Sequence, residues 1–204
     1  MEDNLRCGEM TDSVQFYNNN ANLYKNSIEN ANISDQLQFF LKHIPVDGKI
    51  LDGGCGTGRD SLYMIRQGYN VTAFDASEKM AEIASNNTGL NVVVGDFETI
   101  KLPKNFYDGV WCMSSMLHVN RNNMLMVFNK FYQSLKTGGY LYCTYKLRSC
   151  DFAEGGRCFT CYDEQGFRKL IEKTEFSIES ISELEDSRPG RSEEKWLCVL
   201  LKKN

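Results

Sequence analysis

Hydrophobic positions in the middle of the chain follow two spacings, which predict strands that alternate with helices. Short apolar and β-branched runs predict strands at 49–51, 70–74, 90–94, 107–113 and 140–145. Apolar residues three or four positions apart predict helices at 59–67, 78–86 and 121–136. Because this alternation produces βαβ units, we expect a parallel sheet with helices on both faces.

The pattern changes at both ends of the chain. Residues 13–43 have helical spacing, interrupted by the run Asn18-Asn19-Asn20. Near the C-terminus, a helical pattern at 163–173 precedes strand patterns at 176–184 and 195–202. No helical pattern separates these last two strands, so they are most simply antiparallel.

These patterns predict an α/β fold with a mostly parallel seven-stranded sheet and an antiparallel C-terminal hairpin. A chain of 204 residues is long enough to bury a substantial core as one domain. Within that domain, we expect residues 1–45 to form a helical cap over the active site and residues 46–204 to form the main body.

A glycine-rich turn follows the first predicted strand. It reads D-G-G-C-G-T-G over residues 52–58, with alternating glycines at Gly54, Gly56 and Gly58. Glycine lets the backbone approach a ligand closely, and the N–H groups of the following helix face the turn. A dinucleotide fingerprint of the form G-x-G-x-x-G would need glycine where Arg59 stands, so the spacing disfavours a nicotinamide cofactor.

Acidic and small residues follow the next strands. Asp75 ends the second strand, Gly95-Asp96-Phe97 follows the third, and Ser114 and His118 follow the fourth. Ligands bind at the carboxyl ends of strands in open α/β sheets, so these residues are candidates for one site. Asp75 could accept hydrogen bonds from both hydroxyls of a ribose. The alternatives are a helix N-cap at Asp75 and a capped turn at Asp96.

The glycine turn resembles motif I of the class I S-adenosylmethionine (SAM) methyltransferases, which reads D/E-x-G-x-G-x-G. The segments G-C-G-T-G-R-D-S, D-G-V-W-C-M-S-S-M-L-H-V, G-G-Y-L-Y-C-T-Y-K and G-G-R-C-F-T are most similar to a small stand-alone group that includes tellurite-resistance-type enzymes. The resemblance extends from about Phe16 to Leu201 and implies a Rossmann-like class I methyltransferase sandwich. The chain departs from the family at Gly53, where many relatives have a larger apolar residue, and in the cysteine-rich stretch 150–161.

The resemblance implies that SAM is the cofactor and S-adenosylhomocysteine the product. It also implies that Asp96 binds the adenine amino group and that Tyr17 covers the methionine end of SAM. The full set of expected cofactor-binding residues is Tyr17, Asp52, Gly53, Gly54, Cys55, Gly56, Gly58, Arg59, Asp75, Ala76, Met80, Gly95, Asp96, Phe97 and Ser114.

A second group of residues is expected to contact the methyl acceptor. His118 is the candidate catalytic base, because an imidazole with a near-neutral pKa suits proton transfer; the alternative is that it packs against the next helix. The expected acceptor-binding residues are Tyr24, His118, Lys146, Arg157 and Arg188. The cations among them favour an anionic acceptor, since guanidinium binds carboxylate-like groups, although solvated surface charge is the alternative.

Composition narrows the classes of partner. The net charge of −4 argues against an extended nucleic-acid-binding surface, and no apolar run approaches the length of a membrane span. The acidic N-terminus does not resemble a secretory signal, so we expect a cytoplasmic protein, monomeric or homodimeric. The eight cysteines and two histidines do not form a complete structural-zinc pattern, so we expect reduced thiols and no metal.

The leading hypothesis is a methyltransferase that acts on nitrogen, oxygen, sulfur or a chalcogen of a small molecule, with an anionic acceptor favoured by the cations named above. The alternative is a detoxifying methyltransferase whose methyl acceptor is tellurite or selenite. An NAD(P)-dependent oxidoreductase and a non-catalytic SAM-binding protein remain as other classes. The three prolines cannot form the Pro-Pro-Tyr-type motif of amino-methylating DNA enzymes.

Overall fold

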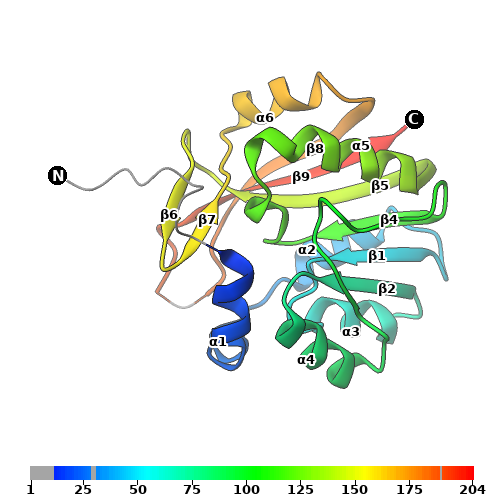
Figure 1. Ribbon diagram of the computed structural model, residues 1–204. Helices are drawn as coiled ribbons and strands as arrows, with labels where there is room; N and C mark the ends of the chain where they lie inside the picture. Colours follow the sequence, from blue (N-terminus) through cyan, green and yellow to red (C-terminus); the bar gives the residue numbers. More distant parts are fainter. Residues whose placement is uncertain (1–11, 29–30, 189) are drawn as a thin grey trace.

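A seven-stranded sheet forms the centre of the structure, which is a computed structural model that describes residues 12–28, 31–188 and 190–204. The strand order is β3-β2-β1-β4-β5-β9-β8 (Figure 1). The strands are β1 (Lys49–Gly53), β2 (Asn70–Asp75), β3 (Val93–Val94), β4 (Tyr107–Cys112), β5 (Leu135–Lys146), β8 (Phe176–Glu185) and β9 (Lys195–Lys203). The first five pair in parallel, and β9 pairs antiparallel with both β5 and β8. The predicted sheet and C-terminal hairpin are therefore confirmed.

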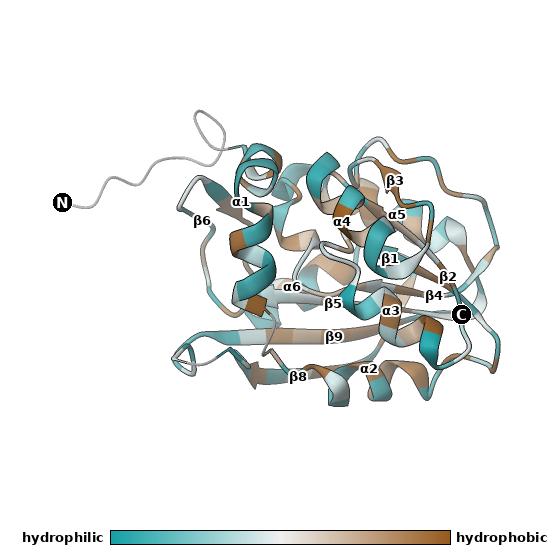
Figure 2. Ribbon diagram, turned by 90° about the horizontal axis from the view of Figure 1, so that it is seen from below, coloured by the Kyte–Doolittle hydropathy of each residue, from teal (hydrophilic) through white to brown (hydrophobic). Residues whose placement is uncertain are grey.

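Helices cover both faces of the sheet, as predicted. They are α2 (Ser34–Leu41), α3 (Arg59–Arg66), α4 (Glu78–Thr88), α5 (Met124–Ser134) and α6 (Glu164–Ile171), whereas α1 (Ser13–Ile28) lies beyond the strand ends, against α4 and β7 (Figure 1). Figure 2 shows the reason: the central strands are largely hydrophobic, and helices such as α2 and α4 combine hydrophobic with hydrophilic residues. Among the described residues, no helix combines the length and the apolar character needed to cross a membrane.

Alternate side chains of the strands belong to different core layers. On β4, Val110 and Cys112 pack in the cluster that includes α5 and α6, whereas Trp111 packs in the cluster that includes α2 and α3. Beside them, α4 packs Ala84 against Ala73 of β2. The period-two alternation of a strand thus supplies two cores at once, one on each face.

The helical segment that precedes the sheet is only partly within the described residues. Residues 1–11 and 29–30 of the cap expected over 1–45 are not among the residues that the structure describes. The expected interruption at Asn18–Asn20 is a kink inside α1, where Asn20 has φ −120° and ψ 17°. Its side-chain amide donates a hydrogen bond of 2.9 Å to the Phe16 carbonyl, which competes with the regular helical bonding.

Three elements differ from the sequence-based expectation. The third strand contains only Val93 and Val94, which pair with the end of β2. The helix expected at 121–136 begins with a 3₁₀ turn at Arg121–Asn123 and ends at Ser134, because Leu135 already pairs with Tyr107 of β4. A separate hairpin, β6 (Phe152–Glu154) and β7 (Arg157–Phe159), was not predicted.

The helix α2 is attached to the sheet by Phe40, and this contact yields a stability prediction. Phe40 is fully buried, with its ring centroid 5.2 Å from that of Trp111, whereas the neighbouring Phe39 is 38% exposed. Phe40→Ala should lower the free energy of unfolding by about 3–5 kcal/mol, because it leaves a cavity in the core. The matched variant Phe39→Ala should lower it much less. Urea denaturation measures both, and equal losses would contradict this packing.

Candidate active site

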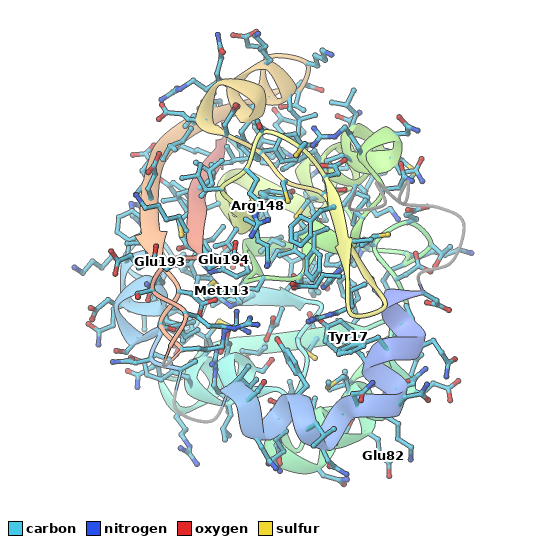
Figure 3. All side chains as sticks on the ribbon, turned by 90° about the vertical axis from the view of Figure 1, so that its left-hand side faces the viewer. Tyr17, Glu82, Met113, Arg148, Glu193 and Glu194 are labelled. Carbon is cyan, nitrogen blue, oxygen red and sulfur yellow. The ribbon has the colours of Figure 1, made fainter. Side chains whose placement is uncertain are left out.

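A cleft of about 910 Å³ lies at the carboxyl edge of the parallel strands. It is lined by the glycine turn and the ends of β2 and β4, by α1, by the β6–β7 hairpin and by the β8–β9 connection. Figure 3 shows α1 and the hairpin side by side at this edge, with Tyr17 between them. The volume is at the upper end of the roughly 300–1,000 Å³ of small-molecule sites, so the cleft has room for more than one ligand.

The glycine turn brings the backbone close to β4. Gly54 has φ +69°, and a Cβ there would lie 2.6 Å from the Cβ of Ser115, so only glycine fits. Gly56 has φ +56°, and a Cβ there would meet nothing within 4 Å. The turn is therefore packed against the protein at Gly54 and open at Gly56, where a ligand can approach the backbone.

Asp75 is held at the end of β2 by two backbone donors. The N–H of Gly56 donates to its Oδ2 at 2.8 Å, and the N–H of Ser77 donates to its Oδ1 at 2.9 Å. Burial raises the pKa of this carboxyl, and the two N–H bonds oppose the rise. Each carboxylate oxygen has two acceptor sites, so both oxygens can still accept a hydrogen bond from a ligand hydroxyl.

Two further carboxylates lie beneath the glycine turn. Asp52 is 2% exposed and accepts a hydrogen bond of 2.5 Å from the Ser61 hydroxyl. Asp60 accepts from Trp111 Nε1 at 3.0 Å and from Arg59 Nε at 2.7 Å. Burial and the neighbouring Asp60 raise the pKa of Asp52. These hydrogen bonds connect β1 and β4 to the first residues of α3.

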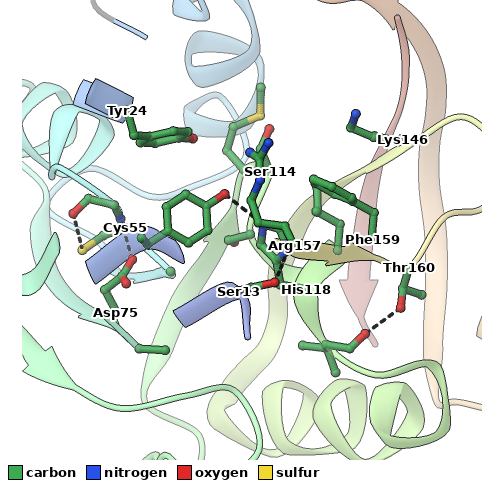
Figure 4. A pocket seen from close by; sticks show the side chains of 18 of the residues that line it. Ser13, Tyr24, Cys55, Asp75, Ser114, His118, Lys146, Arg157, Phe159 and Thr160 are labelled. Carbon is green, nitrogen blue, oxygen red and sulfur yellow. Dashed lines mark hydrogen bonds between the residues drawn. The ribbon is translucent and has the colours of Figure 1, made fainter. Parts of the chain in front are cut away.

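His118 lies inside the cleft (Figure 4), and its side chain meets that of Tyr17, which also lines the cleft. His118 Nδ1 lies 2.8 Å from the Cys158 carbonyl, which can only accept, so Nδ1 carries the proton. The other ring nitrogen, Nε2, lies 3.0 Å from the Tyr17 hydroxyl and accepts its hydrogen bond. Burial lowers the pKa of His118 to about 4, so the ring is neutral at pH 7.

The helix α1 is fastened over the cleft at three points. The Cys158 N–H donates to Ser13 Oγ at 3.2 Å, and the Ser77 hydroxyl donates to Asn18 Oδ1 at 2.7 Å. At the C-terminal end of α1, Arg59 Nη1 donates to the carbonyl of the last helical residue at 3.4 Å. These contacts connect the helix to the hairpin, to α4 and to the glycine turn.

Two of the three cations expected to bind an acceptor are already ion-paired. Lys146 is 4% exposed, and its Nζ lies 2.7 Å from Glu194 Oε2. Arg188 forms a bidentate pair with Asp186. Among the described carboxylates, none forms an ion pair with Arg157.

Most of the expected site residues line this one cleft. They are Tyr17, Tyr24, Asp52, Gly54, Cys55, Gly56, Arg59, Asp75, Ala76, Met80, Asp96, Phe97, Ser114, His118, Lys146, Arg157 and Arg188. Three expected residues do not line it. Gly53 faces Cys112 and Phe97 in the core, Gly58 lies against α4, and Gly95 lies against Ile100.

Asp96 has the capping geometry that the sequence left open as an alternative. Its Oδ1 accepts the N–H groups of Glu98 and Thr99 at 2.7 and 2.8 Å, and its Oδ2 accepts the Thr99 hydroxyl at 2.7 Å. Asp96 still lines the cleft, so the turn that it caps forms part of the cleft wall.

The hairpin contributes cleft residues that sequence reasoning missed. Glu154, Cys158, Phe159 and Thr160 all line the cleft. A signal was present in the sequence: the dipeptide Gly155-Gly156 between two short alternating segments is typical of a two-residue hairpin turn, and both glycines have positive φ. Within the described part of the chain, no three His, Cys, Asp or Glu side chains are grouped so as to hold a metal.

Comparison with known proteins relates the fold and the glycine turn to methyltransferases. Residues 50–139 match a family described as a methyltransferase domain. The putative methyltransferase YqeM of Bacillus subtilis is 25% identical over 132 residues, which cover 62% of this chain and 53% of that protein. The probable SAM-dependent methyltransferase TehB of Haemophilus influenzae is 28% identical over 97 residues, which cover 45% and 34%. The chain thus spans about half or less of these relatives.

The fold is also similar to a solved structure with ligands. The crystal structure of Burkholderia thailandensis 1,6-didemethyltoxoflavin-N1-methyltransferase, with bound 1,6-didemethyltoxoflavin and S-adenosylhomocysteine, superposes with a TM-score of 0.75. It is 18% identical, and the match covers 94% of this chain and 85% of that one. The family match over residues 50–139, the alternating glycines and the strand order thus make this chain similar to the class I SAM-dependent methyltransferases.

Proposed function

We propose that the protein transfers the methyl group of SAM to a nitrogen, oxygen, sulfur or chalcogen atom of a small molecule. The observation that carries this proposal is the continuity of the cleft. One cavity of about 910 Å³ connects the glycine turn and Asp75 to Tyr17, His118 and the β6–β7 hairpin. A cofactor and an acceptor can therefore lie next to each other in it.

The residues at the glycine turn fit SAM. Gly56 leaves open space beside the backbone, and the Asp75 carboxylate has acceptor sites left for two ribose hydroxyls. The cap of residues 1–45 belongs to the proposal as well, and the three attachments of α1 support it. SAM supplies a methyl group that its sulfonium already activates, so the protein has to supply position and orientation.

The chain's own groups can bind the acceptor, exclude water and receive a proton. The helix α1 and the hairpin cover the cleft, which reduces competition from water. The hydrogen bond from His118 Nδ1 to Cys158 leaves Nε2 as the acceptor nitrogen. The Tyr17 hydroxyl bonds to that nitrogen, so the two side chains provide a path for a proton that leaves the acceptor.

An inorganic chalcogen oxyanion is the alternative acceptor. The resemblance to tellurite-resistance-type enzymes in the segments around the glycine turn and β4 supports it. Purified protein with SAM and tellurite or selenite should then release volatile methylated product, detected in the headspace by mass spectrometry. A labelled-methyl transfer screen against a metabolite extract tests the small-organic acceptor in parallel.

The net charge of −4 supports a small-molecule acceptor over a nucleic-acid acceptor. The proposal also includes a cytoplasmic location and a monomeric or homodimeric state.

Asp75→Asn should weaken the binding of S-adenosylhomocysteine by about 10- to 100-fold. The amide lacks the charge that strengthens hydrogen bonds from ribose hydroxyls, and each such bond contributes about 1.5–3 kcal/mol. Isothermal titration calorimetry measures the affinity. The matched control is Glu82→Gln, an exposed position on α4, which should bind as the unmodified protein does. Unchanged affinity in Asp75→Asn would contradict the ribose assignment.

Tyr17→Phe and His118→Gln should slow methyl transfer while leaving the affinity for S-adenosylhomocysteine within about threefold of the unmodified protein. The expected loss in His118→Gln is about 10²-fold, at the lower end of general acid–base effects. Single-turnover rates with the acceptor found in the screen measure this. Tyr63→Phe, outside the cleft, is the control. Full activity in both variants would eliminate the proton path.

The charge state of His118 predicts a pH dependence of stability. In the folded protein, burial of the ring lowers the pKa of His118 to about 4, whereas the pKa of this histidine in the unfolded chain is about 6.5. The unfolded state therefore binds more protons between these values, and stability falls as the pH is lowered from about 6.5 towards 4. Urea denaturation of the unmodified protein and of His118→Gln isolates this contribution. The expected result is a shallower loss in the variant, and parallel curves would contradict the buried neutral ring.

A further inference from the structure

Two cations near the hairpin end of the cleft, Arg157 and Arg191, form no ion pair with a described carboxylate; Arg191 is exposed, whereas Arg157 is partly buried. Lys146 and Arg188 are paired with carboxylates, and so is Arg121, whose partner is Asp151. Arg157 lines the same cavity, and no described carboxylate forms an ion pair with it. Its charge is therefore available to a ligand that enters the cleft.

The Arg157 guanidinium is held in one orientation by aromatic rings. Its Cζ lies 4.3 Å from the ring centroid of Phe16 on α1 and 5.2 Å from that of Phe159 on β7. The Nε atom is buried and has no hydrogen-bond partner, so the two terminal nitrogens are the ones that can reach a ligand. Stacking of this kind orders the planar guanidinium in advance, which reduces the entropy lost on binding.

Arg157 lies close to Tyr17, which is hydrogen-bonded to His118. Its charge and hydrogen bonding act on the Tyr17 hydroxyl, lowering the phenol's pKa against the larger rise caused by burial. Tyr17 in turn bonds to His118. Figure 4 shows Arg157, His118 and Tyr24 in the same cavity. A group bound by Arg157 would thus lie next to the Tyr17–His118 pair.

The surroundings of Arg157 are suited to an organic ligand. Large apolar and aromatic side chains line the same cavity, among them Tyr24, Met113, Phe159 and Trp196. An inorganic oxyanion would not use this surface, whereas the body of an organic acid would bury apolar area against it.

We propose that the methyl acceptor is an organic carboxylate whose carboxyl group is bound by the Arg157 guanidinium. The planar guanidinium presents two parallel N–H donors, which match the two oxygens of one carboxylate. The aromatic walls then hold the organic body, and the Tyr17–His118 pair lies beside it. The role of this carboxylate as methyl acceptor rests on the proposed function. Binding of a carboxylate to Arg157 can be tested separately.

The test uses benzoate and its uncharged analogue benzamide as probes of the full-length protein. Calorimetry or ligand-observed NMR, with and without S-adenosylhomocysteine, should show benzoate binding at least about tenfold more tightly than benzamide. In Arg157→Gln this preference should decrease about 10- to 100-fold. The matched control is Arg168→Gln, an exposed arginine on α6 outside the cleft, which should keep the preference.

Three results would overturn the proposal. They are equal binding of benzoate and benzamide to the unmodified protein, a preference that survives in Arg157→Gln, and displacement of benzoate by equimolar selenite. The first comparison requires no variant, so it stands even if Arg157→Gln does not fold. Absence of S-adenosylhomocysteine binding would overturn the proposed function instead, because benzoate binding is measured independently of it.

Discussion

The close contact between the glycine turn and the end of β4 is the constraint on which the rest of the site depends. The Ser115 hydroxyl donates a hydrogen bond of 2.6 Å to the Gly53 carbonyl, and Gly54 has no room for a Cβ beside Ser115. This contact lies between β1 and β4, where the strand order reverses and where open α/β sheets form their ligand crevice. With the turn held there, the N–H of Gly56 reaches Asp75 and the segment after β4 presents His118 to the cleft.

The charges of the cleft are separated into two regions. The glycine-turn end gathers the carboxylates Asp52, Asp60 and Asp75, each satisfied by hydroxyl, indole, guanidinium or backbone donors. The hairpin end carries the cations, most of which are neutralised by carboxylate partners. A buried charge is costly unless it is paired, so the partly buried Arg157, which has no described carboxylate partner, is more unusual than the exposed and likewise unpaired Arg191. Under the proposed function, Asp75 would face the cofactor and Arg157 the acceptor.

The C-terminal end of the hairpin is also hydrogen-bonded to the segment after β4. The Thr160 N–H donates to the Leu117 carbonyl, and its hydroxyl donates to the Val119 carbonyl, both at 2.7 Å. These bonds hold Cys158 where its carbonyl fixes the tautomer of His118. His118, α1 and the β6–β7 hairpin therefore form one hydrogen-bonded unit.

The sequence by itself determined the sheet, the direction of its strands and the resemblance to methyltransferases. These features depend on local periodicity and backbone freedom, which can be read along the chain. They are the alternating apolar runs, the absence of a helical pattern between 176–184 and 195–202, and the spacing of the glycines. The short β3, the end of α5 at Ser134 and the hairpin were not foreseen, since strand pairing with distant residues outweighs local preference. Only the tertiary structure decided which charges are paired. Lys146, Arg157 and Arg188 look equivalent in the sequence, but Glu194 and Asp186 reach two of them, and Phe16 and Phe159 enclose the third.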